Sequence, residues 1–201
     1  MRLVVGLGNP GSEYARTPHN AGFMVCEALA ARHRLGDPSK RFQGLVYRGR
    51  IGDIDVAVLK PQTYMNRSGD AVSEALRYLP VEHTEILVIF DEMDLPIGKL
   101  RIRPSGGHGG HNGMRSIIDR IGSSDFARLR VGVGRPPAGR SATGHLLGRP
   151  EAGAQEQLAQ ATMRAAEAAE CILQQGVESA MNRFNGLPGL DAEKDAEKET
   201  K

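Results

Sequence analysis

The chain has 201 residues, of which 40% are hydrophobic and 25% are charged, and its formal net charge is +2. This composition is typical of a folded protein with its own core, and it excludes a membrane-spanning chain because no apolar run approaches about 18 residues. We expect one domain over residues 1–185, no signal peptide, and a cytoplasmic location in which Cys26 and Cys171 stay reduced.

The apolar pattern predicts strands and helices in alternation along the chain. The strands are expected at residues 2–7, 45–51, 54–59, 86–90, 99–103 and 129–134, and the helices at 20–34, 69–79, 113–121 and 151–175, with a short helix following to Phe184. "IGDID" at residues 51–55 is typical of a hairpin turn, and "ILVIFD" at 86–91 of a buried central strand. The pattern indicates an α/β fold: a single domain with a twisted mixed β-sheet flanked by helices. We expect the polar segment 186–201 to be a disordered charged tail.

The first predicted strand runs into "GLGNPG", whose glycines have the G-x-G-x-x-G spacing of a dinucleotide-binding fingerprint. That fingerprint needs a helix directly after its last glycine, and an acidic residue at the end of a second strand about 20 positions on. Here Pro18 interrupts any such helix, and the following segment has a helical period where the second strand should be. We therefore interpret the glycines as a tight corner that holds Asn9 and His19 near a strand end.

Polar side chains gather in three groups of loops that follow or adjoin predicted strands. Loops at the carboxyl ends of strands are the usual place for a site in an α/β sheet. Asparagine is frequent among them, and its amide both donates and accepts hydrogen bonds, which suits a polar substrate. The residues are Asn9, Tyr14 and His19 in the first group; Tyr64, Met65 and Asn66 in the second; and Asp91, Asp94, His108, His111 and Asn112 in the third.

The third group offers a possible metal site. His108 and His111 have the spacing H-x-x-H, and Asp91 and Asp94 could complete a ligand set. Glycines surround both histidines, however, and metal ligands need to be held rigidly by the residues behind them. We favour no metal at this position.

A covalent mechanism is disfavoured, because the chain has no G-x-S-x-G motif and neither cysteine lies in these loops. A histidine with an aspartate remains, and that combination suits activation of water: the imidazole accepts a proton and the carboxylate stabilises the imidazolium. His19 is the candidate base; a purely structural role for this histidine is the open alternative.

Charge is distributed unevenly. Residues 99–149 contain ten cationic and two acidic side chains, a local net charge of +8, so the rest of the chain carries −6. A basic half on a nearly neutral protein suggests a polyanionic partner. The alternative is an ordinary solvated surface.

Four segments closely resemble the bacterial-type peptidyl-tRNA hydrolases, and they follow one another in order between residue 2 and about residue 184. They are "VVGLGNPGSEYARTPHNAGF", "KPQTYMNRSG", "DEMDLPIGKLRIRPSGGHGGHNGMRSI" and "FARLRVGVGRP". The resemblance implies a monomeric α/β enzyme that cleaves the ester between a peptide and the 3′ ribose of tRNA, and so recycles tRNA from prematurely released peptidyl-tRNA. It implies no cofactor, no metal, no membrane and no obligate protein partner.

The resemblance also implies roles for individual residues. His19 matches the base that activates water, and Asp91 matches the aspartate that supports it. Asn9 matches an asparagine that distinguishes blocked from free aminoacyl groups. Arg103 and Arg130 match positions that contact tRNA phosphates. The residues that match substrate-binding positions of the cleft are Tyr14, Tyr64, Met65, Asn66, His111 and Asn112.

Two other classes remain open. A non-catalytic RNA-binding relative on the same scaffold is the main alternative, because a fold does not fix a function. Retention of both His19 and Asp91 argues against it, since a binding protein has no need of a water-activating pair. A nucleotide-dependent enzyme is the more distant alternative, and a shift of melting temperature by a dinucleotide would reveal it.

Overall fold

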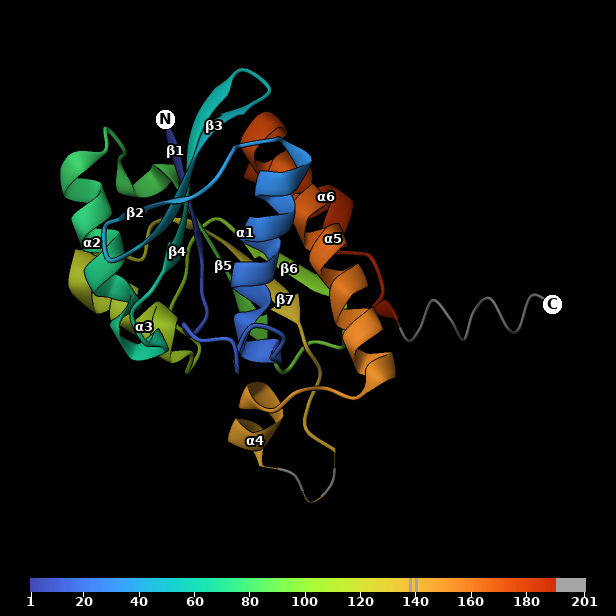
Figure 1. Cartoon of the computed structure of the whole chain (residues 1–201). Coiled ribbons are helices and arrows are strands. Elements are labelled where there is room, and N and C mark those ends of the chain that lie inside the picture. The colour runs from blue at the N-terminus through green and yellow to red at the C-terminus, as the bar shows by residue number, and fades with distance from the viewer. Residues whose placement is uncertain (138, 140, 191–201) are drawn as a thin grey trace.

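The computed structural model describes residues 1–137, 139 and 141–190. Its centre is a seven-stranded sheet with the order β2-β3-β4-β1-β5-β7-β6 (Figure 1). The mixed sheet predicted from the sequence is confirmed. The strands are β1 (Arg2–Gly6), β2 (Ser39–Arg41), β3 (Gly44–Ile51), β4 (Ile54–Pro61), β5 (Ile86–Glu92), β6 (Leu100–Arg103) and β7 (Ala127–Gly132).

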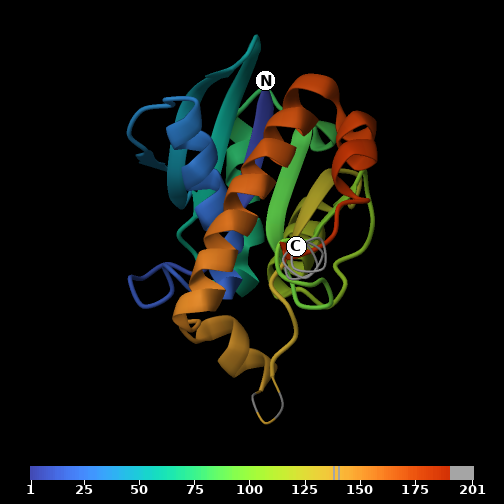
Figure 2. The same ribbon diagram turned by 90° about the vertical axis from the view of Figure 1, so that its right-hand side faces the viewer.

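Helices cover both faces of the sheet. In Figures 1 and 2, α1, α5 and α6 lie on one face, α2 and α3 lie on the other, and α4 lies below the lower edge. The helices are α1 (Ala21–Arg32), α2 (Ser68–Tyr78), α3 (Asn112–Ile121), α4 (Ala142–Leu147), α5 (Ala152–Gln175) and α6 (Val177–Phe184). Two separate hydrophobic clusters fill the two interfaces between sheet and helices. Among the described residues, no helix is both long and apolar enough to cross a membrane.

The four inner strands β4, β1, β5 and β7 run parallel, so their carboxyl ends meet at one edge of the sheet. The strands β2, β3 and β6 are antiparallel to their neighbours. The β3–β4 pair is the hairpin predicted from "IGDID", and β5 is the buried strand predicted from its continuous apolar run. In such a sheet, loops at the carboxyl edge are where a site is expected.

The glycines of the first loop serve close packing. A Cβ atom on Gly6 would lie 2.2 Å from the carbonyl oxygen of Gly22 on α1, and one on Gly8 would lie 2.7 Å from the ring of Phe23. The end of β1 therefore touches the start of α1 directly. No helix begins at Gly11; the loop after β1 instead continues to a single 3-10 turn, Pro18–Asn20, directly before α1.

Most predicted elements are present, and two short ones were missed. The three residues of β2 are all exposed, so the sequence shows no apolar alternation there. α4 has six residues and none of them is buried, which leaves no helical period to detect.

Residues 186–190 differ from the prediction of a disordered tail. Leu190 is buried, and its N–H donates to the carbonyl of Ile97 at 2.9 Å. Just before this segment, the side-chain amide of Asn185 pairs with both the N–H and the carbonyl of Ile102, so it covers the outer edge of β6. The rest of the predicted tail, 191–201, lies outside the described residues.

Candidate active site

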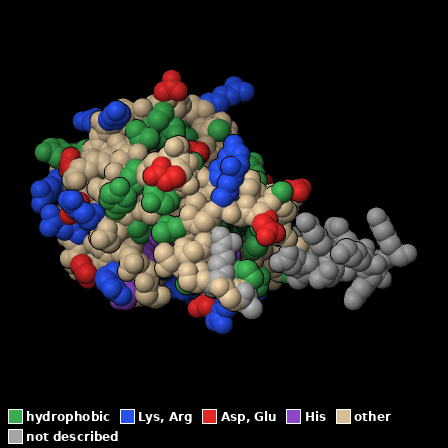
Figure 3. Space-filling view, turned by 60° about the horizontal axis from the view of Figure 1, so that its bottom comes forward, with side chains coloured by type: hydrophobic (Ala, Val, Ile, Leu, Met, Phe, Trp, Pro, Cys, Tyr) green, Lys and Arg blue, Asp and Glu red, His purple; other side chains and the backbone are tan. Residues whose placement is uncertain are grey.

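A cleft of about 520 Å³ opens at the carboxyl edge of the sheet. Figure 3 brings this end of the molecule forward, and Lys and Arg side chains gather at the side where Figure 1 places α2 and α3. Loops after β1, β4 and β5 form the cleft together with the first residues of α3 and one side of α4. Its lining residues are Asn9, His19, Tyr64, Met65, Asn66, Asp91, Glu92, Met93, Gly109, Gly110, His111, Asn112, Ala142, Thr143, Leu146 and Leu147.

Two histidines hold one carboxylate at the bottom of this cleft. His19 Nδ1 lies 2.9 Å from Asp91 Oδ1, and His111 Nε2 lies 3.1 Å from the same oxygen. The two imidazole rings are 5.4 Å apart between centroids. Asp91 is the sixth residue of β5 and is almost fully buried, so the strand fixes the carboxylate and the histidines come to it from two separate loops.

Hydrogen bonds define the roles of the two rings. His111 is the N-cap of α3, and its Nδ1 accepts from the N–H of Met114 at 3.3 Å. Its Nε2 must then carry the hydrogen that is donated to Asp91, so both nitrogens of His111 are used. His19 donates to Asp91 through Nδ1, and its Nε2 has no hydrogen-bond partner among the described residues. That nitrogen is available to a ligand in the cleft.

The carboxyl of Asp91 is ionised at neutral pH. Burial works to raise its pKa, but the hydrogen bonds from His111 and His19 and their charges outweigh burial and hold the pKa below its usual range. A fixed negative charge therefore faces His19, where it stabilises an imidazolium.

Asn9 is anchored on three sides. Its backbone N–H and carbonyl pair with the side-chain amide of Asn20, each at 2.9 Å. Its side-chain oxygen accepts from the N–H of Met65, also at 2.9 Å. These bonds tie the loop after β1 to the loop after β4, and they leave the Nδ2 group of Asn9 as a donor at the cleft wall.

Two further asparagines and a tyrosine complete the polar wall. Asn66 lies in the 3-10 turn Met65–Arg67, and Asn112 is the first residue of α3; both are exposed in the cleft. Tyr64 is 64% exposed and lies at the rim. The structure thus brings together eight of the residues predicted from the sequence: Asn9, His19, Tyr64, Met65, Asn66, Asp91, His111 and Asn112.

Three predicted residues lie outside the cleft lining. Tyr14 is half-buried in the loop after β1, where its N–H donates to Gly11. Arg103 is exposed on the edge strand β6. Arg130 lies on β7 and forms an ion pair of 3.4 Å with Glu92, which does line the cleft.

One arginine of the basic segment 99–149, Arg128, does not contribute to its surface. This arginine is fully buried, and its guanidinium donates to the carbonyls of Gly106 and Gly107 in the glycine loop before α3. Burial and the nearby charge of Arg130 lower the pKa of Arg128 to about 10. Arg128 therefore anchors the loop that leads to His111 and is not available to a partner.

The geometry separates the residues that were considered as a metal-ligand set and disfavoured, His108, His111, Asp91 and Asp94. His108 Nδ1 accepts from the N–H of Gly110, and Asp94 pairs with Arg135 at 2.8 Å. His19, Asp91 and His111 do have ligand atoms within 4.8 Å of one another. The two ring nitrogens that face Asp91 carry hydrogens, however, so the arrangement fits hydrogen bonding better than a cation.

The cleft also has an apolar side, which was not predicted from the sequence. Met93 follows β5 directly, and four residues come from α4: Ala142, Thr143, Leu146 and Leu147. Two features in the sequence indicate this helix: Ser141, which is its N-cap, and the pair Leu146-Leu147 near its end. A helix of six residues is too short to show an apolar period, so these features alone did not predict it.

An imidazole–carboxylate pair in an open polar cleft is typical of hydrolases, in which such a pair can activate water. The sequence profile described as "Peptidyl-tRNA hydrolase" matches residues 3–195. A peptidyl-tRNA hydrolase of Synechococcus sp. (strain JA-3-3Ab) is 50% identical over 190 residues, which cover 93% of this chain and 84% of the relative. One of Halalkalibacterium halodurans is 45% identical over 185 residues, 92% of this chain and 100% of the relative. The crystal structure of peptidyl-tRNA hydrolase from Acinetobacter baumannii superimposes with a TM-score of 0.86 at 40% identity, covering 94% of this chain and 96% of that one. The chain belongs to the peptidyl-tRNA hydrolase family.

Proposed function

We propose that this protein hydrolyses the ester bond between a peptide, or an N-blocked aminoacyl group, and the 3′ ribose of tRNA, with His19 as the general base. The observation that carries the proposal is the free Nε2 of His19 in a cleft where its Nδ1 is held by the buried Asp91 carboxylate. A base oriented by a carboxylate is the arrangement that activates water in the absence of a protein nucleophile.

The reaction proceeds in two steps. In the first, His19 Nε2 takes a proton from water as the water oxygen bonds to the ester carbonyl carbon, and Asp91 stabilises the imidazolium. In the second, the bond from that carbon to the ribose oxygen breaks, and the imidazolium returns the proton to the leaving 3′ oxygen. The peptide carboxylic acid then releases its remaining water proton to solvent, so that peptide carboxylate and free tRNA result. The charge on the carbonyl oxygen in between requires a donor, and the amides of Asn66 and Asn112 are the candidates in the cleft.

Asn9 is proposed to select the blocked substrate. Its Nδ2 group suits a peptide carbonyl, and its rigid anchoring to Asn20 and Met65 keeps that donor in place. A free aminoacyl group offers an ammonium at that point, which leaves the donor unpaired. Main-chain recognition of this kind accepts any peptide sequence. Tyr64, Met65 and His111 line the same cleft, and Tyr14 is proposed to contact the substrate from the adjoining loop.

Arg103 and Arg130 are proposed to bind tRNA phosphates. Arg103 is exposed on the edge strand, and a phosphate would compete with Glu92 for the partly exposed Arg130. Phosphate contacts carry no base sequence, so this surface would accept every tRNA. We further propose that the protein works as a monomer in the cytoplasm, where its substrate arises, and without a cofactor.

The test is release of peptide from N-acetyl-aminoacyl-tRNA by the purified protein, with and without a chelator. Hydrolysis in both conditions supports the proposal. Tight tRNA binding without hydrolysis would instead identify a non-catalytic RNA-binding protein.

A further inference from the structure

A second hollow lies beside the cleft, between the β2–β3 hairpin and α2. Its volume is about 800 Å³, larger than that of the cleft. Its walls include the exposed Lys40 and Arg41 on β2, Phe42 and Gln43 at the tip of the β2–β3 hairpin, Gln62 and Thr63 after β4, and Glu74 on α2. We call it the hairpin groove.

The groove is continuous with the cleft along the chain. Gln62 and Thr63 line the groove, and the next two residues, Tyr64 and Met65, line the cleft. Two residues of extended chain span at most about 7 Å. The two hollows therefore meet at residues 62–65, and a peptide that leaves the cleft past Tyr64 enters the groove.

The order of the sheet places the groove opposite the proposed RNA contacts. The groove lies at the β3–β4 side and the cleft at the ends of β1 and β5, whereas the exposed Arg103 and the partly exposed Arg130 lie on β6 and β7, at the other side of the sheet. The scissile ester has RNA on one side and peptide on the other. With RNA at the β6–β7 side, the peptide runs toward β4 and the hairpin.

The chemistry of the groove suits a peptide main chain. Its inner wall carries the amide of Gln62 and the hydroxyl of Thr63, whose Oγ1 is buried without a hydrogen-bond partner among the described residues. The amide of Gln43 donates to Glu74 through Nε2, which leaves its oxygen as an acceptor. Gln62 makes only long contacts, of 3.4 and 3.5 Å, to backbone carbonyls of its own loop. Such groups pair with the N–H and carbonyl groups of any peptide.

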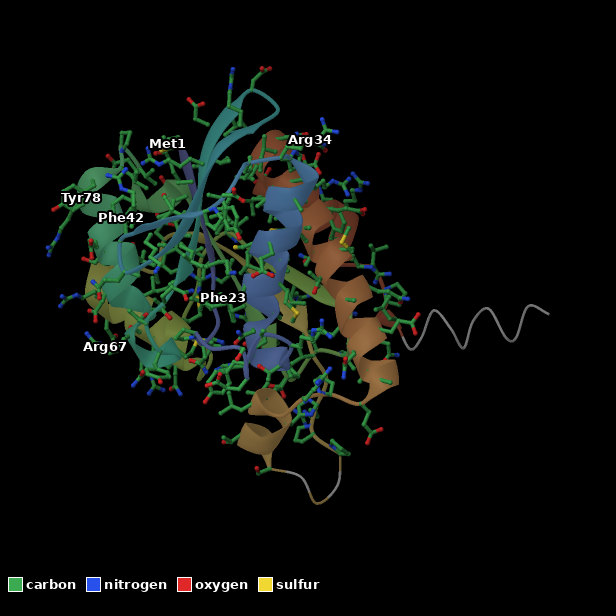
Figure 4. All side chains as sticks on the ribbon, viewed as in Figure 1. Met1, Phe23, Arg34, Phe42, Arg67 and Tyr78 are labelled. Atoms are coloured by element: carbon green, nitrogen blue, oxygen red, sulfur yellow. The ribbon has the colours of Figure 1, made fainter. Side chains whose placement is uncertain are left out.

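Nucleic acid fits the groove less well. RNA bases bind single-strand sites largely by stacking on free aromatic faces. The ring of Phe42 is buried and already stacked on Tyr78, with centroids 6.0 Å apart and an angle of 15° (Figure 4). The two cations of the groove, Lys40 and Arg41, lie on the β2 wall, and Arg41 covers the ring of Phe42 at 5.4 Å. The wall near the cleft, formed by Gln62 and Thr63, carries an amide and a hydroxyl and no cation.

The hairpin tip is held in a conformation that few residues adopt. Phe42 and Gln43 have φ values of 53° and 50°, in the left-handed region that favours glycine. Gln43 keeps this geometry through two bonds of 2.8 Å, from its carbonyl to the N–H of Gln62 and from its Nε2 to Glu74. Such strain persists where surrounding structure holds it, and often at ligand sites. One wall of the groove is thus preformed.

We propose that the hairpin groove binds the main chain of the substrate's peptide, beyond the two residues nearest the ester. This inference rests on the proposed function and adds a second subsite to it. The groove gives longer peptides an affinity advantage that single N-acetylated residues lack, and side chains contribute little to it.

The test compares N-acetyl-glycyl-tRNA with N-acetyl-tetraglycyl-tRNA in the intact protein. Gln62 is exposed, so Gln62→Trp fills the groove without disturbing the core; Gln160→Trp, on the exposed side of α5 across the sheet, is the matched control. The wild type is expected to show a lower KM for the longer substrate. Gln62→Trp is expected to raise that KM about three- to tenfold, the worth of one or two hydrogen bonds, and to leave the short substrate unchanged. Gln160→Trp should change neither.

A second comparison does not depend on a bulky side chain. Thr63→Val removes the unpartnered hydroxyl at nearly constant volume and is expected to reduce the same length advantage. A tetrasarcosyl substrate, which lacks main-chain N–H groups, is expected to lose it in the wild type. Equal effects of Gln62→Trp on both substrates would overturn the proposal in favour of an RNA contact, and no effect on either would overturn it outright. If the wild type hydrolyses neither substrate, the proposed function fails first.

Discussion

His19 and His111 donate to the same oxygen of Asp91, yet their remaining nitrogens differ. His111 gives its Nδ1 to the N–H of Met114 at the start of α3, and His19 keeps Nε2 for the cleft. One ring is therefore fixed as a support for the carboxylate, and the other can gain and lose a proton. The two roles differ because His111 caps α3, which uses its Nδ1, whereas His19 caps no helix with its ring.

Asp91→Asn should weaken the base without unfolding the protein. The pKa of Asp91 is lowered, so at neutral pH the wild type presents a carboxylate that stabilises protonated His19. An uncharged amide removes that stabilisation, and His19 then holds a proton less tightly. The acidic limb of the pH–rate profile is expected to move to lower pH, with turnover reduced at its plateau. A limb at the wild-type position would contradict the pairing.

Asn9→Ala should reduce discrimination between blocked and free aminoacyl-tRNA. The donor that pairs with a peptide carbonyl is lost, and an unpaired polar group no longer penalises the free substrate. The measurement is kcat/KM for N-acetyl-aminoacyl-tRNA and for the same aminoacyl-tRNA without the acetyl group. A ratio that falls about tenfold, one hydrogen bond's worth, is expected. An equal loss on both substrates would mean that Asn9 only ties the loop to Met65.

At the scale of elements, the β6–β7 pair shows how one arginine is buried beside others that are not. Arg103 and Arg128 are opposite each other in the ladder, as are Arg101 and Arg130. The glycine loop covers Arg128 and takes its hydrogen bonds, while Arg103 at the sheet edge stays exposed. Cover by the glycine loop, and not position along the ladder, thus decides which of these arginines can meet a phosphate.

Arg103→Ala and Arg130→Ala should each raise KM for peptidyl-tRNA with little change in kcat. Phosphate contacts hold substrate and transition state equally, so their loss weakens binding alone. Each variant should also reduce the slope of log Kd against log salt by about 0.7–0.9, the release of one counterion. The control is Arg48→Ala, which removes an exposed positive charge on β3, far from β6 and β7 in the sheet order, and should leave KM unchanged.

A minimal ester substrate that lacks the tRNA body distinguishes a role of the two arginines in tRNA binding from a role in the fold or the cleft. It should be hydrolysed at the wild-type rate by both arginine variants. If it is slowed as much as the full substrate, Arg103 and Arg130 support the fold or the cleft, and the RNA surface lies elsewhere.

For the whole molecule, the sequence predicts what depends on local period and spacing. The six longer strands, the hairpin at 51–55 and all the helices except α4 follow from apolar patterns. The polar loops after β1, β4 and β5 follow from the edge rule for α/β sheets. The roles of individual site residues came from family resemblance and stay predictions.

Features set by tertiary contacts were not predictable. The burial of Arg128 depends on a loop folding over it, and the helix α4 is too short to show a period. The groove beside the cleft arises from two left-handed residues at a hairpin tip, which nothing in "RFQG" indicates. Nor does the sequence reveal that His111 uses both nitrogens.

The central claim is that His19 is the base, and His19→Ala tests it most directly. The measurement is turnover of N-acetyl-aminoacyl-tRNA together with Kd for tRNA, with His83→Ala as control because His83 is exposed just before β5, at the opposite edge of the sheet. Turnover is expected to fall by about 10²–10⁴, the usual contribution of a positioned proton acceptor, while tRNA affinity and the control variant stay at wild-type values. Turnover within a few fold of the wild type would contradict the account.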